Sequence, residues 1–332
     1  MNGDMKQNFI MTEEEKLQVQ KWIRRIGACP ESMKDTPTGK VLKDTVGSLG
    51  KMIRPGLLLA CGSFGPDYQI QKDRLCMLGA LVELTHLSSL IHDDIIDDAP
   101  LRRGMSSIQG KYGKDAAVYA GDFLIARINF WEARQHCNDA AQILASTVED
   151  MCVGEIGQAM CRYHPTVTCK QYYDNIRGKT ASLFRAACKI GAMTAGCDEE
   201  LIRVLERFGE HLGIMFQLRD DLIDFSSNGC EDGKKTHKDF QDGIYTLPVL
   251  MAMRIPEARK ELLPIMEENQ KRVLAEEEIR QMEEIVIRYQ GVVDTGKEIL
   301  HRADLCYDIL NALPSSDSVT ALKELLAMLT AL

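Results

Sequence analysis

The sequence lacks several features, and each absence excludes a class of protein. The 332 residues carry a net charge of −9 with a pI near 5.4, whereas binding a nucleic-acid backbone requires a basic surface. No continuous run reaches the roughly 18 apolar residues of a membrane span, and the polar, acidic N-terminus does not read as a signal peptide. We therefore expect a soluble, cytoplasmic protein without a nucleic-acid partner or a transmembrane segment.

Cysteine is present, but without the pattern of a disulfide framework or a zinc site. The cysteines number eleven, an odd count, and no two of them stand in a Cys-x-x-Cys spacing. Disulfides are rare in cytosolic proteins, and structural zinc sites usually use closely spaced pairs. We interpret the cysteines as reduced thiols that mostly serve packing.

Signals for β-strands are nearly absent. No extended alternation of apolar and polar residues occurs, and no Asn-Gly or Asp-Gly turn joins two β-branched runs. Helical periodicity, with apolar residues at i, i+3, i+4 and i+7, dominates instead. The predicted helices include segments 73–98, 115–135, 139–161, 170–195, 199–225 and 245–253.

Breaks in this periodicity fall where Gly, Pro, Ser and Asp gather. They lie at 27–39, 62–68, 99–114, 162–168 and 226–242. The last is long enough to be functional. No break is polar and extended enough to be an interdomain linker, and no repeat of fixed period is present, so the sequence predicts one all-α domain over residues 1–332.

Two clusters of aspartate stand in otherwise apolar helical segments, as HDDIIDD and DDLID. On a helix, Asp93 and Asp97 lie on one face about 5–6 Å apart, as do Asp220 and Asp224. Such pairs repel unless they are solvated or share a hard cation, and magnesium prefers a few carboxylates together with water and phosphate oxygens. Either cluster alone could be a solvated helix face, but the two together favour metal-dependent phosphate chemistry.

Basic residues of the types that bind phosphate stand near the breaks. They are Lys51, Arg54, Arg102, Arg103, Lys179, Lys234 and Lys235. The Gly-Lys-Thr that contains Lys179 does not make a P-loop, because Tyr173 stands where the first glycine would be.

Together these blocks resemble those of the medium- and long-chain all-trans polyprenyl diphosphate synthases. The match is collinear from about Gly50 to Pro248 and comprises GKMIRP, ELTHLSSLIHDDIIDDAPLRRG, GKTASLF, FQLRDDLID and GKKTHKDFQDGIYTLP. The resemblance implies a single helical bundle of the isoprenoid synthase type, with both acid motifs in a central cleft. It also implies a homodimer, magnesium as the cofactor, and isopentenyl diphosphate and an allylic diphosphate as substrates.

The resemblance also implies a role for each residue of these blocks. A cluster of three magnesium ions would be bound by Asp93, Asp97 and Asp220, with waters or further partners held by Asp94, Asp221 and Asp224. Isopentenyl diphosphate would be bound by Lys51, Arg54, His86 and Arg103. The allylic diphosphate would be bound by Arg102, Lys179 and Lys234, while the reacting carbons would face Thr180 and Gln217.

His86 could be either a ligand or a core residue, and a lone histidine on an apolar helix is more often a core residue. It stands seven residues, or two helical turns, before Asp93 on nearly the same face. Within the ELTH block we interpret it as a ligand.

The residues before Asp93 predict the length of the product. Ser89, Ser88 and Thr85 stand four, five and eight positions earlier, and none is aromatic. By the resemblance, the growing chain descends past them, so we expect a product of about six to eight isoprene units, with geranylgeranyl diphosphate as the shorter alternative. An aromatic ring at Ser88 or Ser89 should shorten the product by filling its path.

Two positions depart from the family's usual pattern. Many members have Gly-Gly-Lys-Arg where this chain has Leu49-Gly-Lys-Met52, and many have lysine where this chain has Ile244. The second departure removes one diphosphate-binding lysine near the long break.

Other functions remain open from the sequence. A metal phosphohydrolase built on His92 and Asp93 would need further ligands, and the remaining histidines form no obvious ligand pattern. A class I terpene cyclase would share the fold, but it normally replaces the second aspartate motif and has no isopentenyl site. The chain could also be the catalytic or the regulatory partner in a heteromeric synthase, although intact acid motifs disfavour the regulatory role.

Overall fold

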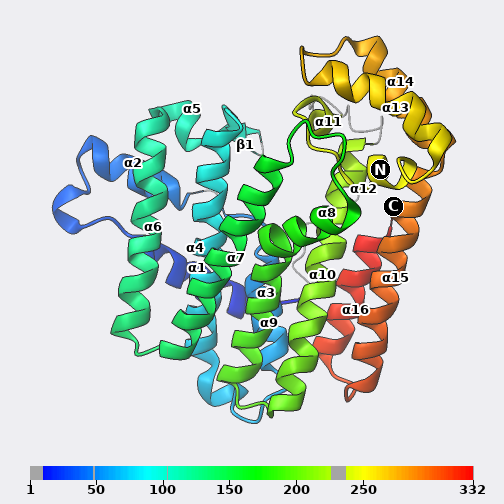
Figure 1. The fold of residues 1–332 in the computed structure, drawn as a ribbon. Coiled ribbons are helices and arrows are strands. Elements are labelled where there is room, and N and C mark those ends of the chain that lie inside the picture. The colour runs from blue at the N-terminus through cyan, green and yellow to red at the C-terminus, as the bar shows by residue number, and fades with distance from the viewer. Residues whose placement is uncertain (1–9, 48, 103, 226–236, 332) are drawn as a thin grey trace. The chain divides into compact units, whose positions relative to one another are not determined.

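The computed structural model describes residues 10–47, 49–102, 104–225 and 237–331, and helices form most of them (Figure 1). The helices up to residue 160 are α1 (Glu13–Ile26), the 3-10 helix η1 (Glu31–Met33), α2 (Pro37–Thr45), α3 (Ile53–Gly62), α4 (Tyr68–Ile96), α5 (Ile108–Tyr112), α6 (Lys114–Arg134) and α7 (Asn138–Met160). Those that follow are α8 (Cys169–Ile176), the π-helix η2 (Arg177–Ala181), α9 (Ser182–Thr194), α10 (Glu199–Phe225), α11 (Lys238–Gln241), α12 (Leu247–Ala252), α13 (Pro256–Asn269), α14 (Glu276–Arg288), α15 (Gly291–Ala312) and α16 (Asp317–Thr330).

Strands within the described residues are limited to one antiparallel pair. β1 (Leu101–Arg102) pairs with β2 (Met105–Ser106), and Arg102 lies opposite Met105. Gly104 has a φ of +75°, a conformation that glycine adopts without steric cost. The all-α class predicted from the sequence is confirmed, and this short hairpin lies in the segment 99–114, which was predicted only as a break.

The chain folds into two compact units. Unit 1 comprises the described residues of Met1–Val148 with Ala186–Glu206 and Ser315–Leu322. Unit 2 comprises the described residues of Glu149–Arg185, Arg207–Pro314 and Lys323–Leu332. The single domain expected from the sequence stays a prediction.

α4 is the central helix of unit 1. It packs against α1, α3 and α6, and every residue from Leu75 to Thr85 is buried. A helix that is apolar on all sides is expected to be surrounded by others. By length and composition α4 could also cross a membrane, but 72% of its most apolar stretch is buried inside the protein, as in a core helix. Towards its C-terminal end the side chains become partly exposed, and the first acid cluster stands there.

In unit 2, α12 packs against α8, α14 and α15, and α14 packs against α13. The part of α10 in this unit buries Leu212, Met215 and Leu218 and ends at Phe225, directly after the second acid cluster. Each acid cluster therefore follows a buried stretch of a long helix.

The predicted helices match the observed ones closely over α4, α6, α7, α10 and α12. The segment 170–195, predicted as one helix, is instead α8, the π-helix η2 and α9. The end of the long break, residues 237–242, contains α11, while residues 226–236 lie outside the described residues.

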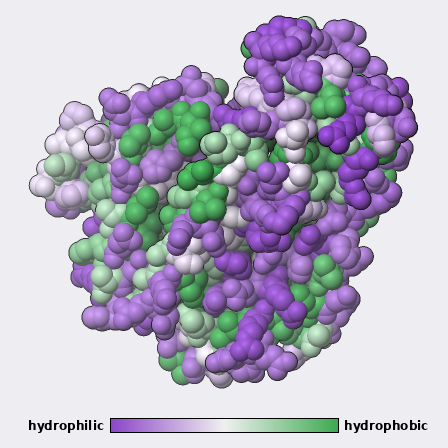
Figure 2. Space-filling model, in the orientation of Figure 1, coloured by the Kyte–Doolittle hydropathy of each residue, from purple (hydrophilic) through white to green (hydrophobic). Residues whose placement is uncertain are grey.

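The surface of α6 carries several exposed apolar side chains. They are Val118, Tyr119, Ile125 and Phe130, with exposed fractions of 39%, 74%, 36% and 49%. Figure 2 shows apolar groups among hydrophilic ones over α6 and α7. Contiguous exposed apolar side chains are typical of surfaces that bind a partner.

Candidate active site

The first acid cluster lies at the C-terminal end of α4. The backbone N–H of Asp97 donates to the carbonyl of Asp93 at 2.9 Å, so the helical turn that joins the two aspartates is intact. Asp93 is partly exposed and Asp97 exposed, whereas Asp94 is only 4% exposed. The structure therefore turns the first and last aspartates of the motif outwards and the second one inwards.

Asp94 is held by Arg102 from β1. The Nε and Nη2 atoms of Arg102 both donate to Asp94 Oδ1 at 2.7 Å. Burial raises the pKa of Asp94, and the guanidinium of Arg102 opposes that rise. One edge of the Arg102 fork is thus engaged, while the Nη1 edge has no bond to Asp94.

Three of the four residues expected to bind isopentenyl diphosphate lie in unit 1, just before α3, on α3 and on α4. Lys51 precedes α3 and is exposed, and Arg54 in its first turn is partly exposed. The start of α3 lies against α4, because a Cβ on Gly79 would be 3.4 Å from Pro55 Cβ. His86 is partly exposed and lies seven residues, about 10 Å, further along α4.

The second acid cluster lies at the C-terminal end of α10, in unit 2. Asp220 is exposed, Asp221 is 2% exposed, and Asp224 is partly buried. The carboxylate of Asp224 accepts the backbone N–H groups of Lys238 and Asp239, each at 3.3 Å. Asp224 thereby holds the N-terminal end of α11, and burial raises its pKa.

Asp239, which the sequence did not single out, lies near these carboxylates. Burial, and then the neighbouring charges of Asp224 and Asp221, raise its pKa to about 7. Its position in the KDFQDG segment gave no signal, because the contact depends on how α11 returns to the end of α10.

A chain of three hydrogen bonds connects the second motif to Thr180. The hydroxyl of Tyr172 donates to Asp221 Oδ2, and Gln217 Nε2 donates to Asp221 Oδ1 at 2.8 Å. The hydroxyl of Thr180 donates to Gln217 Oε1 at 2.6 Å. Burial raises the pKa of Asp221 to about 6, and the bonds from Tyr172 and Gln217 counter that effect.

Tyr172 was missed by the sequence analysis, although a signal existed. Thr168 and Gln171 form a capping box that begins α8 and places Tyr172 and Ile176 on its buried face. A buried tyrosine usually needs a partner for its hydroxyl. The identity of that partner could not be read from the chain.

Lys179 and Thr180 lie in the π-helix η2, and π-turns are frequent at functional sites. Lys179 Nζ lies 3.1 Å from Glu155 Oε1 on α7. The same turn comes very close to α7 at Gly154, where a Cβ would lie 2.4 Å from the backbone nitrogen of Lys179. The Gly-Lys-Thr segment is thus a packed helical turn, which agrees with rejecting the P-loop.

Both acid motifs are placed where a cation is favoured. α4 and α10 have no Lys or Arg in their last described turns, and the C-terminal end of a helix dipole carries partial negative charge. Aspartates there add to that negative potential. Oxygen donors in pairs suit magnesium, which takes one or two carboxylates and completes its shell with water and phosphate oxygens.

Within the described residues, no three His, Cys, Asp or Glu side chains converge into a site that could hold a metal without further ligands. The predicted residues gather in two sets. Unit 1 contains Lys51, Arg54, Thr85, His86, Ser88, Ser89, Asp93, Asp94, Asp97 and Arg102. Unit 2 contains Lys179, Thr180, Gln217, Asp220, Asp221 and Asp224. Arg103 and Lys234 lie outside the described residues.

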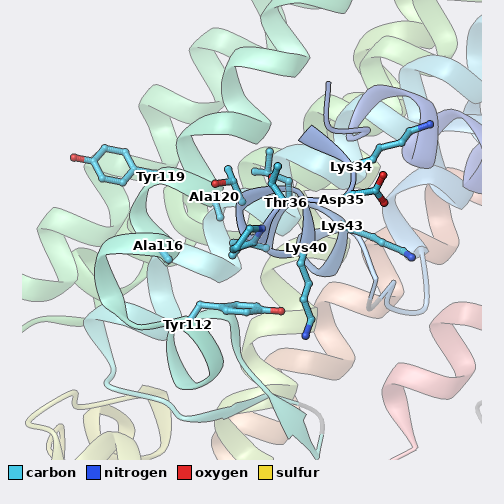
Figure 3. Close-up of a pocket in the computed structure, with 13 residues that line it drawn as sticks. Lys34, Asp35, Thr36, Lys40, Lys43, Tyr112, Ala116, Tyr119 and Ala120 are labelled. Carbon is cyan, nitrogen blue, oxygen red and sulfur yellow. The ribbon is translucent and has the colours of Figure 1, made fainter. Parts of the chain in front are cut away.

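A separate groove of about 980 Å³ lies between α2 and the α5–α6 segment of unit 1. Figure 3 shows the ammonium groups of Lys34 and Lys43 directed away from Tyr112 and Tyr119. The hydroxyl of Tyr112 already donates to Asp44 at 2.5 Å. The groove contains none of the predicted site residues, so it is not a candidate active site.

The chain is similar to known proteins over most of its length. A family model described as Polyprenyl synthetase matches residues 36–286. The chain is 38% identical over 213 residues to heptaprenyl diphosphate synthase component 2 of Bacillus subtilis (strain 168). That match covers 64% of this chain and 60% of the Bacillus protein, so the chain spans about three fifths of this relative's length.

Solved structures are similar over nearly the whole chain. Heptaprenyl diphosphate synthase from Staphylococcus aureus has a TM-score of 0.83 and 25% identity, with 96% of this chain and 98% of that one covered. A polyprenyl synthase from Caulobacter crescentus, complexed with calcium and isoprenyl diphosphate, has a TM-score of 0.83 and 27% identity, with 96% and 95% covered. These similarities confirm the predicted isoprenoid synthase fold class.

Proposed function

Because the chain belongs to the polyprenyl synthetase family, we propose that it is an all-trans polyprenyl diphosphate synthase. It condenses isopentenyl diphosphate head-to-tail with an allylic diphosphate. The observation that carries this proposal is the pair of aspartates at the C-terminal end of each of two long helices, α4 and α10. Family membership removes the support for a metal phosphohydrolase, and the second intact motif disfavours a terpene cyclase.

Magnesium is the proposed cofactor, with three ions per active site. Asp93, Asp97 and Asp220 are its proposed ligands, and each of them is exposed or partly exposed. Asp94 bonds to Arg102, Asp221 bonds to Gln217, and Asp224 accepts the backbone N–H groups of Lys238 and Asp239. When bound, magnesium would neutralise charge on the departing diphosphate.

The basic residues bind the two diphosphates through charge-assisted hydrogen bonds. Lys179 and the Nη1 edge of Arg102 bind the allylic diphosphate, together with Lys234 from the segment outside the described residues. Lys51, Arg54, His86 and Arg103 bind isopentenyl diphosphate.

Thr180 and Gln217 present oxygen dipoles to the allylic carbon as its bond to oxygen breaks. The double bond of isopentenyl diphosphate then attacks that carbon, and the proton is lost to the released pyrophosphate. The chain therefore supplies binding and orientation, and it needs neither a nucleophile nor a strong base of its own.

The expected result for the purified protein is magnesium-dependent condensation of isopentenyl diphosphate with an allylic primer of five to twenty carbons. Radiolabelled isopentenyl diphosphate and chromatography of the products would measure it. A chain with no product at saturating magnesium, for any of these primers, would either need a second chain or lie outside the proposed function. Addition of a candidate partner chain separates these two explanations.

The assembly state is part of this proposal. The exposed apolar side chains of α6 support a homodimer, since such a face is typical of an interface. The word "component" in the Bacillus relative's name supports the alternative of a heteromeric enzyme in which this chain is the catalytic subunit. Light scattering of the active preparation distinguishes the two.

The proposed product has about six to eight isoprene units, which the name of the heptaprenyl relative supports. Geranylgeranyl diphosphate remains the shorter alternative. Ser88 is only 2% exposed, and its hydroxyl donates to the backbone carbonyl of Gly121 on α6 at 3.1 Å. Ser89 is partly exposed and donates to its own helix at His86. Ser89 is therefore the better position for testing the path of the product.

Ser89→Phe should shorten the main product by at least about one isoprene unit while the protein stays folded, because the ring fills space along the path. Ser88→Phe should lower stability by about 1–3 kcal/mol, since a ring at this position presses on α6. Product chromatography and thermal unfolding measure the two effects. An active, folded Ser89→Phe enzyme with unchanged products would place the path elsewhere.

A further inference from the structure

A chain of hydrogen bonds runs from Tyr172 through Asp221 and Gln217 to Thr180, and the donor and acceptor of each bond are fixed. A tyrosine hydroxyl can only donate to a carboxylate, so Tyr172 occupies Asp221 Oδ2 as a donor. The other oxygen of Asp221 accepts from the amide nitrogen of Gln217, which turns the amide oxygen towards Thr180. The hydroxyl hydrogen of Thr180 is then committed to Gln217, and the lone pairs of its oxygen point elsewhere.

The residues at both ends of this chain are shielded from water. Tyr172, Thr180 and Asp221 have exposed fractions of 6%, 8% and 2%. Water is therefore a poor substitute for the Tyr172 hydroxyl, and without that donor one oxygen of a buried carboxylate loses its partner. The hydrogen bonds of a buried polar network strengthen one another, so the loss of one donor weakens the remaining bonds as well.

The ring of Tyr172 is held independently of its hydroxyl. It packs edge-to-face against Tyr173, with ring centres 5.5 Å apart, and the guanidinium of Arg302 lies 5.5 Å from the centre of the Tyr173 ring. Phenylalanine at position 172 can keep this packing. Tyr172→Phe therefore removes one hydrogen bond and little else.

We infer that Tyr172 is a positioning residue for the reaction proposed above. Through Asp221 it fixes the amide of Gln217, and through that amide it fixes the hydroxyl of Thr180, so that the oxygen dipoles at the allylic carbon keep one orientation. Tyr172 touches neither substrate in this scheme. The inference rests on the proposed function, because it assigns Thr180 and Gln217 to the reacting carbons.

This role makes a specific kinetic prediction for Tyr172→Phe. Dipoles aimed at the reacting carbon act on the transition state, whereas the diphosphates are bound by other residues. We expect kcat to fall by about 10-fold to 100-fold, the loss typical of small misplacements. The KM values of both diphosphates and the magnesium concentration for half-maximal activity should change by less than about twofold. Tyr173→Phe, which removes the neighbouring hydroxyl, should keep normal turnover.

A double variant separates positioning from general stability. If Tyr172 acts through Thr180, Tyr172→Phe should have little further effect on kcat when Thr180 is already valine. Independent effects would multiply instead. The fraction of folded protein, from thermal unfolding and circular dichroism, normalises every rate.

The outcomes are distinguishable. Wild-type protein that makes no product with any primer, alone or with a partner chain added, contradicts the proposed function, and the inference falls with it. Active wild-type protein with normal kcat in Tyr172→Phe contradicts the inference alone. The same holds if the losses multiply in the double variant, or if added magnesium restores Tyr172→Phe, since Tyr172 would then act on metal binding through the neighbouring Asp220.

Discussion

Turnover is expected to fall by at least about a thousandfold when Asp93 or Asp220 is replaced with alanine, while helical content is retained. A loss of this size corresponds to about 4 kcal/mol of transition-state stabilisation. Both side chains are exposed or partly exposed at the ends of long helices, so their removal deletes charge rather than packing. A negative side chain at the C-terminal end of a helix opposes the helix dipole, so removing the aspartate should not destabilise the helix.

The measurement is kcat at saturating magnesium, with circular dichroism as the check on folding. Asp304→Ala is a matched control, because Asp304 is an exposed aspartate within α15 and belongs to neither acid motif. It should retain turnover within about twofold, as surface substitutions usually do. A folded Asp93→Ala or Asp220→Ala enzyme with near-normal kcat would remove that aspartate from the metal site.

The substitution Gly154→Ala is expected to have the second large effect. Gly154 lies on α7 against the π-helix η2. A Cβ there would be 2.4 Å from Lys179 N and 2.6 Å from Asn175 O, both of them backbone atoms. The backbone of η2 must then shift, which should lower the free energy of unfolding by about 2–3 kcal/mol. Because Lys179 and Thr180 move with it, kcat should fall by about 100-fold.

Gly157 provides the control for this substitution. It lies one turn further along α7, and a Cβ there would meet the side-chain oxygen of Asn175 at 2.3 Å, which a rotamer change relieves. Gly157→Ala should therefore be neutral or slightly stabilising, since alanine favours helix over glycine by up to about 1 kcal/mol. The measurements are the free energy of unfolding in urea and kcat for both variants. Equal behaviour of Gly154→Ala and Gly157→Ala would show that the contact with η2 is not tight.

The long helices could be predicted from the sequence because the pattern that indicates a helix lies within the helical segment itself. Apolar periodicity located α4 and α10, and the spacing of Asp93 and Asp97 put them on one face. The inward position of Asp94 follows from the same geometry, because successive residues on a helix face different directions. Assigning the residues to substrates depended on resemblance, and most of that assignment is still a prediction.

The remaining features depend on contacts between segments far apart in the chain. The π-helix that carries Lys179 accompanies a close backbone approach to Gly154, which no periodicity records. The strands β1 and β2 are two residues each, too short for an alternating pattern. The bond from Tyr172 to Asp221 joins residues 49 positions apart, so neither one reveals its partner locally.

The contact between Arg102 and Asp94 restricts how these positions can change during evolution. One edge of the guanidinium fork holds a buried carboxylate, and in the proposed function the opposite edge binds a second anion, the allylic diphosphate. Lysine has a single point charge and would have to choose between the two anions. Replacing either Arg102 or Asp94 alone also leaves the charge of the other without its partner. Substitution of this pair without loss of stability therefore requires both positions to change together.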